Sequence, residues 1–256
     1  MYSLLSNPFT RGLAAGFLKY LNVNFNMPKP LEILYQDAHL VVINKPNGLL
    51  VHRSSMANDA DEFAVQLLRD QIGQFVYPVH RLDRKTSGVL VFALDKETTR
   101  LLQEEMQKKQ TVKEYHAIVR GYFPEEIKVD YALTNDRGKV QEAITRFERL
   151  KTTEIDLPLG KYSTSRYSLI KAFPETGRMH QIRKHCNHLR HPIIGDRPHG
   201  CSKQNRLFKE RWNMTTMLLH AKKLVLFHPF SKEKLRIEAR FPAEFLRMQA
   251  TLLLRD

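Results

Sequence analysis

The sequence predicts one mixed α+β domain in which strands outnumber helices. Short runs rich in β-branched residues at 31–37, 39–46 and 88–94 are typical of strands, and the last is apolar enough to be buried. No internal repeat, low-complexity tract or linker rich in glycine, serine and proline divides the sequence. We therefore assign residues 27–256 to a single domain and residues 1–26 to a loosely ordered extension before it.

Two helices are predicted in the first half of the chain. Residues 59–72 and 95–110 each place apolar side chains at helical spacing, with charged residues between them. Asp95 stands at the start of the second segment, where an aspartate side chain can accept a hydrogen bond from the backbone of the first turn. We therefore expect Asp95 to be the N-cap residue.

The second half of the chain is expected to contain further strands, one helix and one irregular stretch. The strands are expected at 113–121, 143–149, 166–173, 217–229 and 234–241. The segment 176–196 opens with a glycine turn, continues as a helix and stops at Pro192. The basic stretch 197–215 is expected to be irregular.

The chain is strongly basic, and the excess of positive charge is concentrated in one segment. Lysine and arginine exceed aspartate and glutamate by 14, and the sequence pI is about 9.8. Residues 178–223 contain 11 of the lysines and arginines but only two acids, Asp196 and Glu210. This concentration favours a polyanionic partner over a basic face that only contacts solvent. Among polyanionic partners, nucleic acid is favoured over an anionic membrane surface.

Several classes of protein are disfavoured by simple counts. Cys186 and Cys201 cannot build a disulfide framework, which favours a reducing cytoplasm. No apolar run reaches the length of about 20 residues that a membrane-spanning helix needs, so no membrane is expected. The histidine-rich segment 180–191 matches no standard zinc spacing, and no glycine-rich loop is present to cradle a nucleotide cofactor.

The motif HRLDRKTSG surrounds one carboxylate, Asp83, with His80, Arg81, Arg84 and Lys85. Nearby cations keep a carboxylate ionised at neutral pH. A fixed, ionised carboxylate suits a nucleophile or a stabiliser of a cation-like sugar centre, and it suits a general acid poorly. The alternative is a surface turn held by salt bridges. Glycoside hydrolysis normally needs two carboxylates, and no second acid stands out here, which disfavours hydrolysis.

Four segments together resemble the successive motifs of the RluA-type pseudouridine synthases, in the same order and with plausible spacing. They are NKPNGLLVH, HRLDRKTSG, KEYHAIVRG and TGRMHQIRKHCNHLRHPIIGD, and the resemblance covers about residues 31–240. It implies the pseudouridine synthase fold, a central mixed, mostly antiparallel sheet with flanking helices and loops. It also implies an isomerase that converts a uridine in RNA to pseudouridine without a cofactor or metal.

The resemblance also assigns roles to individual residues. Asp83 matches the catalytic aspartate, and Arg183 matches the arginine that pairs with it. Ile182 matches the aliphatic residue that lines the uracil pocket. Tyr115, which by residue type alone would be a core aromatic, matches the residue that stacks on the base and assists proton removal from its C5. Arg81 matches the arginine that holds the opened RNA helix after the target nucleotide has left it.

Longer stretches look like the subgroup that modifies uridine 65 of tRNA. They are RDQIGQFVYPVHRLDR, GKYSTSRYSL and LRHPIIGDRPHG followed by QNRLF. We therefore expect tRNA as the RNA partner, the cytoplasm as the location and no obligate protein partner. The alternatives are a synthase for ribosomal RNA or another tRNA site, and a non-catalytic RNA-binding protein.

Overall fold

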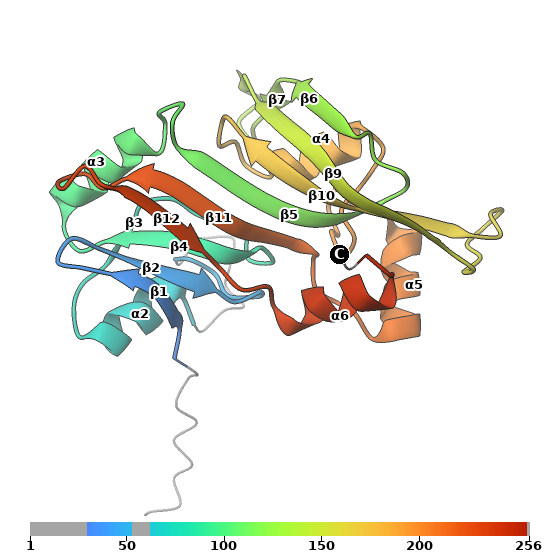
Figure 1. The fold of residues 1–256 in the computed structure, drawn as a ribbon, viewed down its shortest axis with the longest axis horizontal. Helices are drawn as coiled ribbons and strands as arrows, with labels where there is room; N and C mark the ends of the chain where they lie inside the picture. The colour runs from blue at the N-terminus through green and yellow to red at the C-terminus, as the bar shows by residue number, and fades with distance from the viewer. Residues whose placement is uncertain (1–29, 53–61, 255–256) are drawn as a thin grey trace, which may run out of the picture.

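The computed structural model describes residues 30–52 and 62–254, and one large sheet dominates them (Figure 1). Its strands are β1 (Glu32–Gln36), β2 (Leu40–Lys45), β3 (Tyr77–Pro78), β4 (Ser87–Ala93), β5 (Val112–Arg120), β6 (Glu126–Asp130), β9 (Ile144–Ile155), β10 (Ser165–Pro174), β11 (Leu219–Phe227) and β12 (Lys234–Glu238). Separately, β7 (Leu133–Thr134) pairs with β8 (Val140–Gln141). The helices are α2 (Ala64–Ile72), α3 (Lys96–Glu105), α4 (Gln181–His188), α5 (Ser202–Trp212) and α6 (Ala243–Thr251). The predicted extension 1–26 lies outside the described residues, so the domain boundary at residue 27 stays a prediction.

The order of strands along the sheet is β1-β2-β4-β11-β5-β10-β9-β6, with β12 beside β11 and β3 beside β4. Among the described strands only β4 and β11 pair in parallel, with Ser87 opposite His220, and all other pairs are antiparallel. The predicted α+β class with a mixed, mostly antiparallel sheet is therefore confirmed. This parallel pair lies in the interior of the sheet, between β2 and β5.

Strand β4 is buried along its whole length because helices cover both of its faces, which explains its near-continuous apolar sequence. Leu90 packs in one cluster with Leu68 of α2, whereas the next residue, Val91, packs in another with Leu102 of α3. Side chains alternate between the faces of a strand, so α2 and α3 lie on opposite faces of this part of the sheet. The start of β4 is thereby fixed within the core.

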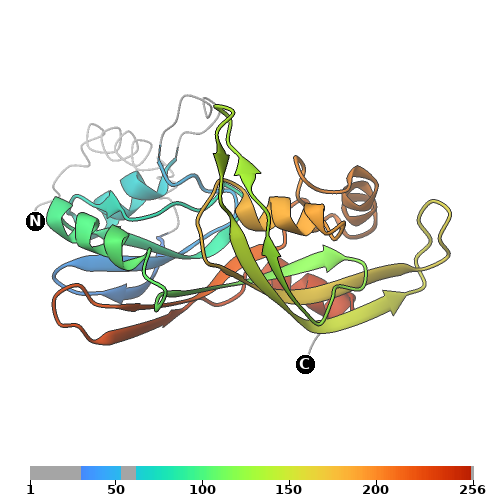
Figure 2. The ribbon, with the colours of Figure 1, turned by 90° about the horizontal axis from the view of Figure 1, so that it is seen from above.

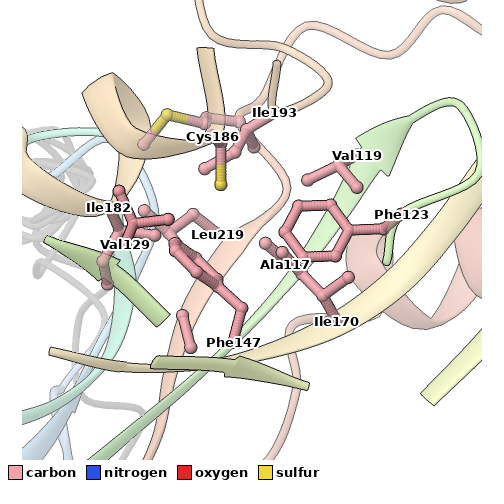
Figure 3. Packing of buried hydrophobic residues seen from close by; sticks show 12 residues of the cluster. Ala117, Val119, Phe123, Val129, Phe147, Ile170, Ile182, Cys186, Ile193 and Leu219 are labelled. Atoms are coloured by element: carbon pink, nitrogen blue, oxygen red, sulfur yellow. The ribbon is translucent and has the colours of Figure 1, made fainter. Parts of the chain in front are cut away.

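Strand β5 is covered in the same way at the other half of the sheet. Ala117 packs with Ile182 and Cys186, one turn apart on α4, as Figure 3 shows. The adjacent Ile118 belongs to the cluster that contains Phe245 of α6. Since Tyr115 contacts the clusters of both α2 and α4, it lies where the two halves of the core meet.

The predicted elements are mostly present, but the short strands β3, β6, β7 and β8 were not predicted, and three further differences concern the helices. Asp95 caps α3 as expected, its Oδ1 accepting from the backbone N–H of Thr98 at 2.7 Å, but the helix ends at Glu105 rather than near residue 110. The stretch 197–215 is not irregular, because it contains α5. Only Gln204 and Phe208 of α5 are buried, so its sequence carries almost no apolar period. Helix α6, after the last predicted strand, was missed.

The buried His220 should make the fold sensitive to mild acid. Its Nδ1 lies 2.9 Å from the hydroxyl of Ser87, and burial lowers its pKa to about 4. The unfolded chain, with an ordinary pKa near 6.5, binds more protons than the folded chain between about pH 4 and pH 6.5. Stability should therefore fall by about 2 kcal/mol from this group alone as the pH drops from 6.5 to 5. Urea unfolding of His220→Gln between pH 5 and 7 should show a shallower pH dependence than wild type, and an unchanged slope would contradict the assignment.

Candidate active site

Asp83 lies in the turn that leads from β3 into the central strand β4. The backbone N–H of Thr86 donates to the Asp83 carbonyl at 3.0 Å and closes this turn. Gly88, with φ +110°, then brings β4 so close to β11 that an added Cβ would lie 2.1 Å from the carbonyl oxygen of Ala221. Gly88, the last residue of the motif HRLDRKTSG, thus allows the close strand approach that holds Asp83 at the edge of the core.

Arg183, on α4, joins two carboxylates from distant parts of the chain. Its Nη1 donates to Asp83 Oδ2 at 2.8 Å, while Nε and Nη2 donate to the two oxygens of Asp196, each at 2.7 Å. Burial opposes the charge of the guanidinium, but the hydrogen bonds to Asp196 and Asp83 outweigh it and raise the pKa of Arg183. The bidentate pair with Asp196 leaves Nη1 aimed at Asp83.

The second Asp83 oxygen faces His180, at the start of α4. His180 Nε2 lies 3.8 Å from Asp83 Oδ1, and His180 Nδ1 lies 2.9 Å from Nε2 of His199. Burial lowers the pKa of both imidazoles below the ordinary value. Both rings are therefore mainly neutral at neutral pH, and the formal positive charge beside Asp83 comes from Arg183.

A pocket of about 410 Å³ opens over these groups, which is within the usual size of a ligand site. Its polar wall includes Asp83, Arg81, Arg183, His180 and Asp196, and its apolar wall includes Leu50, Val51, Leu82 and Met217. The Asp83 carboxylate, bonded to Arg183, thus faces a pocket with both cationic and apolar walls. Such a site can stabilise positive charge at a sugar carbon and exclude bulk water.

The remaining two predicted site residues, Tyr115 and Ile182, are not among the residues that line this pocket. Tyr115 sits in β5 opposite Ala221 of β11, and burial, with a smaller contribution from the charge of Asp83, raises the pKa of its phenol. Ile182 is 7% exposed and points into the core cluster drawn in Figure 3. Asp83, Arg81 and Arg183 therefore share one pocket wall, while Tyr115 and Ile182 pack in core clusters that include the lining residues Leu82 and Met217.

The interpretation of the motif's own cations as partners of Asp83 is largely wrong. His80 is not a cation, because burial lowers its pKa to about 4 and its Nε2 accepts from the backbone N–H of Val91 at 3.2 Å. Arg84 Nε instead donates to the carbonyl of Gly48, and Lys85 Nζ to that of Thr215. The close cationic partner is Arg183, 100 residues further along the chain.

Comparison with known proteins agrees with this geometry. The sequence profile described as RNA pseudouridylate synthase matches residues 39–188. The chain belongs to this family. The proteins named tRNA pseudouridine synthase C of Vibrio parahaemolyticus and Yersinia pestis are each 46% identical to it, over 83% and 82% of this chain and 91% and 86% of theirs. The predicted membership among RluA-type pseudouridine synthases, which are isomerases, is confirmed.

Two solved structures share the fold of this pseudouridine synthase. Human RNA Pseudouridylate Synthase Domain Containing 4 has a TM-score of 0.67 and 25% identity, covering 96% of this chain and 97% of that one. Human RNA Pseudouridylate Synthase Domain Containing 1 has a TM-score of 0.65 and 23% identity, covering 83% and 84%. Because the Domain Containing 1 structure is only 23% identical to this chain, its similarity concerns the fold alone.

Two charged residues of this pseudouridine synthase were not expected at the site. Asp196 is 1% exposed and fixes Arg183, as described above. Lys45 is fully buried and donates to the carbonyls of Pro46, Leu49 and Arg84. Burial lowers the pKa of Lys45 to about 7, and the charge of Asp83 partly offsets this. The available signals were an acid within a basic segment and a lysine at the end of an apolar strand.

The histidine-rich segment contributes structure in the described part of the synthase. His185 contacts the hydroxyl of Thr145 at 2.9 Å and the carbonyl of Tyr131 at 3.0 Å, and His188 stacks on the ring of Tyr131. Cys186 is buried in the core, which raises the pKa of its thiol. No group of three or more potential metal ligands occurs among the described residues. These side chains therefore secure α4, which carries Arg183, against the sheet.

Proposed function

We propose that this synthase isomerises uridine 65 of tRNA to pseudouridine, with Asp83 as its catalytic residue. The observation that carries the assignment of Asp83 is its pairing with Arg183 at the floor of a pocket with both cationic and apolar walls. Relatives named tRNA pseudouridine synthase C that cover most of the chain support tRNA as the substrate. The choice of uridine 65 rests on the sequence resemblance to that subgroup.

The enzyme must first take the target nucleotide out of the folded RNA. Flipping a nucleotide costs a few kcal/mol, which contacts between cations and the RNA phosphates can offset. The basic segment 178–223 supplies such cations beside the pocket. Arg81, exposed at the pocket rim, would occupy or brace the gap that the flipped nucleotide leaves.

The chemistry breaks the bond between C1′ and N1 and makes a bond between C1′ and C5. Asp83 assists cleavage either by attacking C1′ or by removing the C2′ proton, and both routes need an ionised carboxylate that Arg183 holds in place. The detached uracil turns within the pocket and rejoins through C5. The proton on C5 is lost and N1 gains one, so the reaction is balanced without a redox partner or imported group, and no cofactor is proposed.

Tyr115 and Ile182 would flank the base once it has entered. The raised pKa of Tyr115 means that its phenol is neutral at pH 7, so it can take the C5 proton only by passing on its own proton at the same time. The hydroxyl of Tyr115 would therefore take part in proton transfer, a role separate from the stacking of its ring on the base.

RNA, and tRNA in particular, is the proposed partner, with no obligate protein partner and the cytoplasm as the location. No helix among the described residues has the length and apolar character needed to cross a membrane.

The test is tritium release from tRNA labelled at C5 of uridine, followed by mapping of the modified position. Release and a new pseudouridine at position 65 are expected. Release only from ribosomal RNA, or modification elsewhere in tRNA, would refute the proposed target. Binding of RNA without release from any substrate would favour a non-catalytic RNA-binding protein, and free uracil in the chromatogram would identify a hydrolase.

Substituting Tyr115→Phe should separate stacking from proton transfer. The phenylalanine ring still stacks on the base, so the affinity for tRNA should stay close to that of wild type. Loss of the hydroxyl should lower turnover by about 10²- to 10⁴-fold, the usual contribution of a proton-transfer group. Single-turnover tritium release with saturating enzyme measures this step, and wild-type rates in the variant would exclude a role for the hydroxyl.

A further inference from the structure

A second hollow, of about 400 Å³, lies next to the catalytic pocket and is built largely by helix α5. Its lining includes Gly195, Arg197, Asn205, Arg206, Lys209 and Thr215. Arg197 lines both this hollow and the catalytic pocket. Lys85 of the catalytic pocket also donates to the carbonyl of Thr215 at 3.3 Å, so the two depressions are adjacent. The reaction at Asp83 requires no group from the α5 hollow.

The α5 hollow carries cations that are not neutralised within the protein. The side chains of Arg197, Arg206 and Lys209 are exposed, and they make no hydrogen bond or ion pair with any described residue. Glu210 is the one acid in the lining. The pKa of Lys85 is lowered by burial and, in addition, by the charges of Arg197 and Arg84. Positive charges are therefore crowded together at the boundary between the two depressions. This repulsion is unfavourable in the free protein, and an anion that binds there offsets it.

The walls of the α5 hollow are fixed relative to the catalytic residues. Asn205 Nδ2 donates to the carbonyl of Asp196 at 2.6 Å, and its Oδ1 accepts from the backbone N–H of Gly195 at 2.9 Å. Gly195, with φ +82°, packs so closely that an added Cβ would lie 1.8 Å from the carbonyl oxygen of Thr216. The buried Phe208 anchors the inner side of α5. The helix backbone that carries Arg206 and Lys209 on its outer side is thus fixed relative to Asp196, which bonds Arg183.

We infer that the α5 hollow binds backbone phosphates of the RNA strand that flanks the target nucleotide, forming a second RNA subsite which aligns that strand with the catalytic pocket. Arginine and lysine are the usual protein contacts to phosphate, and such contacts fix register and orientation without reading bases. Continuity through Arg197 gives the strand an uninterrupted cationic path into the pocket. The inference rests on the proposed function, because it takes the flipped nucleotide to be part of an RNA substrate.

The test compares two doubly substituted proteins that lose the same charge. Arg206→Ala with Lys209→Ala removes two cations of the hollow, while Lys96→Ala with Lys109→Ala removes two exposed lysines, one at the start of α3 and one in the turn that follows it. Figures 1 and 2 show α3 and α5 at opposite ends of the molecule. The probe is an unmodified tRNA transcript with uridine at position 65, and its affinity is measured by fluorescence anisotropy over a range of salt concentrations.

The hollow variant should bind the transcript roughly tenfold or more weakly at low salt, since it loses two charge-assisted contacts to phosphate. Its slope of log affinity against log salt should be reduced by about 1.4 to 1.8, the value for two lost phosphate contacts. Saturating enzyme should restore the single-turnover rate, and Arg206→Lys alone should retain most of the affinity. The α3 variant should bind and react as wild type does.

Wild-type affinity and salt slope in the hollow variant would overturn the inference, as would equal losses in both variants, which would indicate a general effect of net charge. The binding measurement does not depend on turnover. If the wild-type protein binds the transcript through α5 but releases no tritium, the proposed function fails while the subsite stands. If the hollow variant binds and turns over as wild type does, the subsite fails while the proposed function stands.

Discussion

Replacing Asp83 with asparagine should abolish pseudouridine formation while leaving the affinity for tRNA near that of wild type. The amide has the same shape, and its oxygen can still accept from Arg183 Nη1, which in the native protein lies 2.8 Å from the carboxylate. What is lost is the negative charge that either attacks C1′ or removes the C2′ proton. Removal of such a group typically costs on the order of 10⁴-fold in rate.

Tritium release and anisotropy with the same labelled tRNA measure the two quantities separately. Asp70→Asn on α2 is a suitable control, because Asp70 is 65% exposed and pairs only with its exposed neighbour Arg69 in the described structure. This control should react as wild type does. Turnover by Asp83→Asn within tenfold of wild type would remove Asp83 from the chemistry, whatever its position in the motif.

The local sequence was sufficient to single out Asp83 as a candidate functional carboxylate, but not to identify the partner of its charge. The charges around Asp83 are visible within the nine consecutive residues HRLDRKTSG. The close approach of β4 to β11 at Gly88 joins residues far apart in the chain and was not predicted. The pairing of Asp83 with Arg183 joins positions 100 residues apart, so the residues alone left a surface salt bridge as an equal alternative. Only the family resemblance singled out Arg183 before the fold was known.

The wrong prediction of an irregular stretch at residues 197–215 has a different cause, because too few buried apolar residues mark the helix there. Helix α5 buries two positions only, and one of them, Gln204, is polar because it accepts a hydrogen bond from the hydroxyl of Tyr167. An apolar period cannot reveal a helix that is anchored in this way. Similarly, an aspartate within a basic segment could signal an ion pair, but not that Asp196 would be buried, since its burial depends on the pairing with Arg183 of α4.

Substituting Asp196→Asn should lower kcat by about 10- to 100-fold while changing KM little, because Asp196 acts on the reaction through Arg183. The bidentate pair between Arg183 and Asp196 fixes the guanidinium plane, and the third hydrogen bond then reaches Asp83. An asparagine offers a single acceptor oxygen and no charge, so the guanidinium can tilt away from Asp83. It also leaves a buried cation partly uncompensated, which should lower the free energy of unfolding by about 1–3 kcal/mol.

A loss of stability alone could mimic a loss of activity, so the comparison needs a second buried carboxylate far from the pocket. Glu105, 5% exposed at the end of α3, bonds Lys108 and Gln110 and serves this purpose as Glu105→Gln. Both substitutions should lower the melting temperature, but only Asp196→Asn should reduce the single-turnover rate of fully folded protein below its melting range. If the two variants lose rate in proportion to stability, Asp196 supports the fold and does not position Arg183. If Asp196→Asn alone loses rate at unchanged tRNA affinity, the orientation of the Arg183 guanidinium is what makes the Asp83 carboxylate effective.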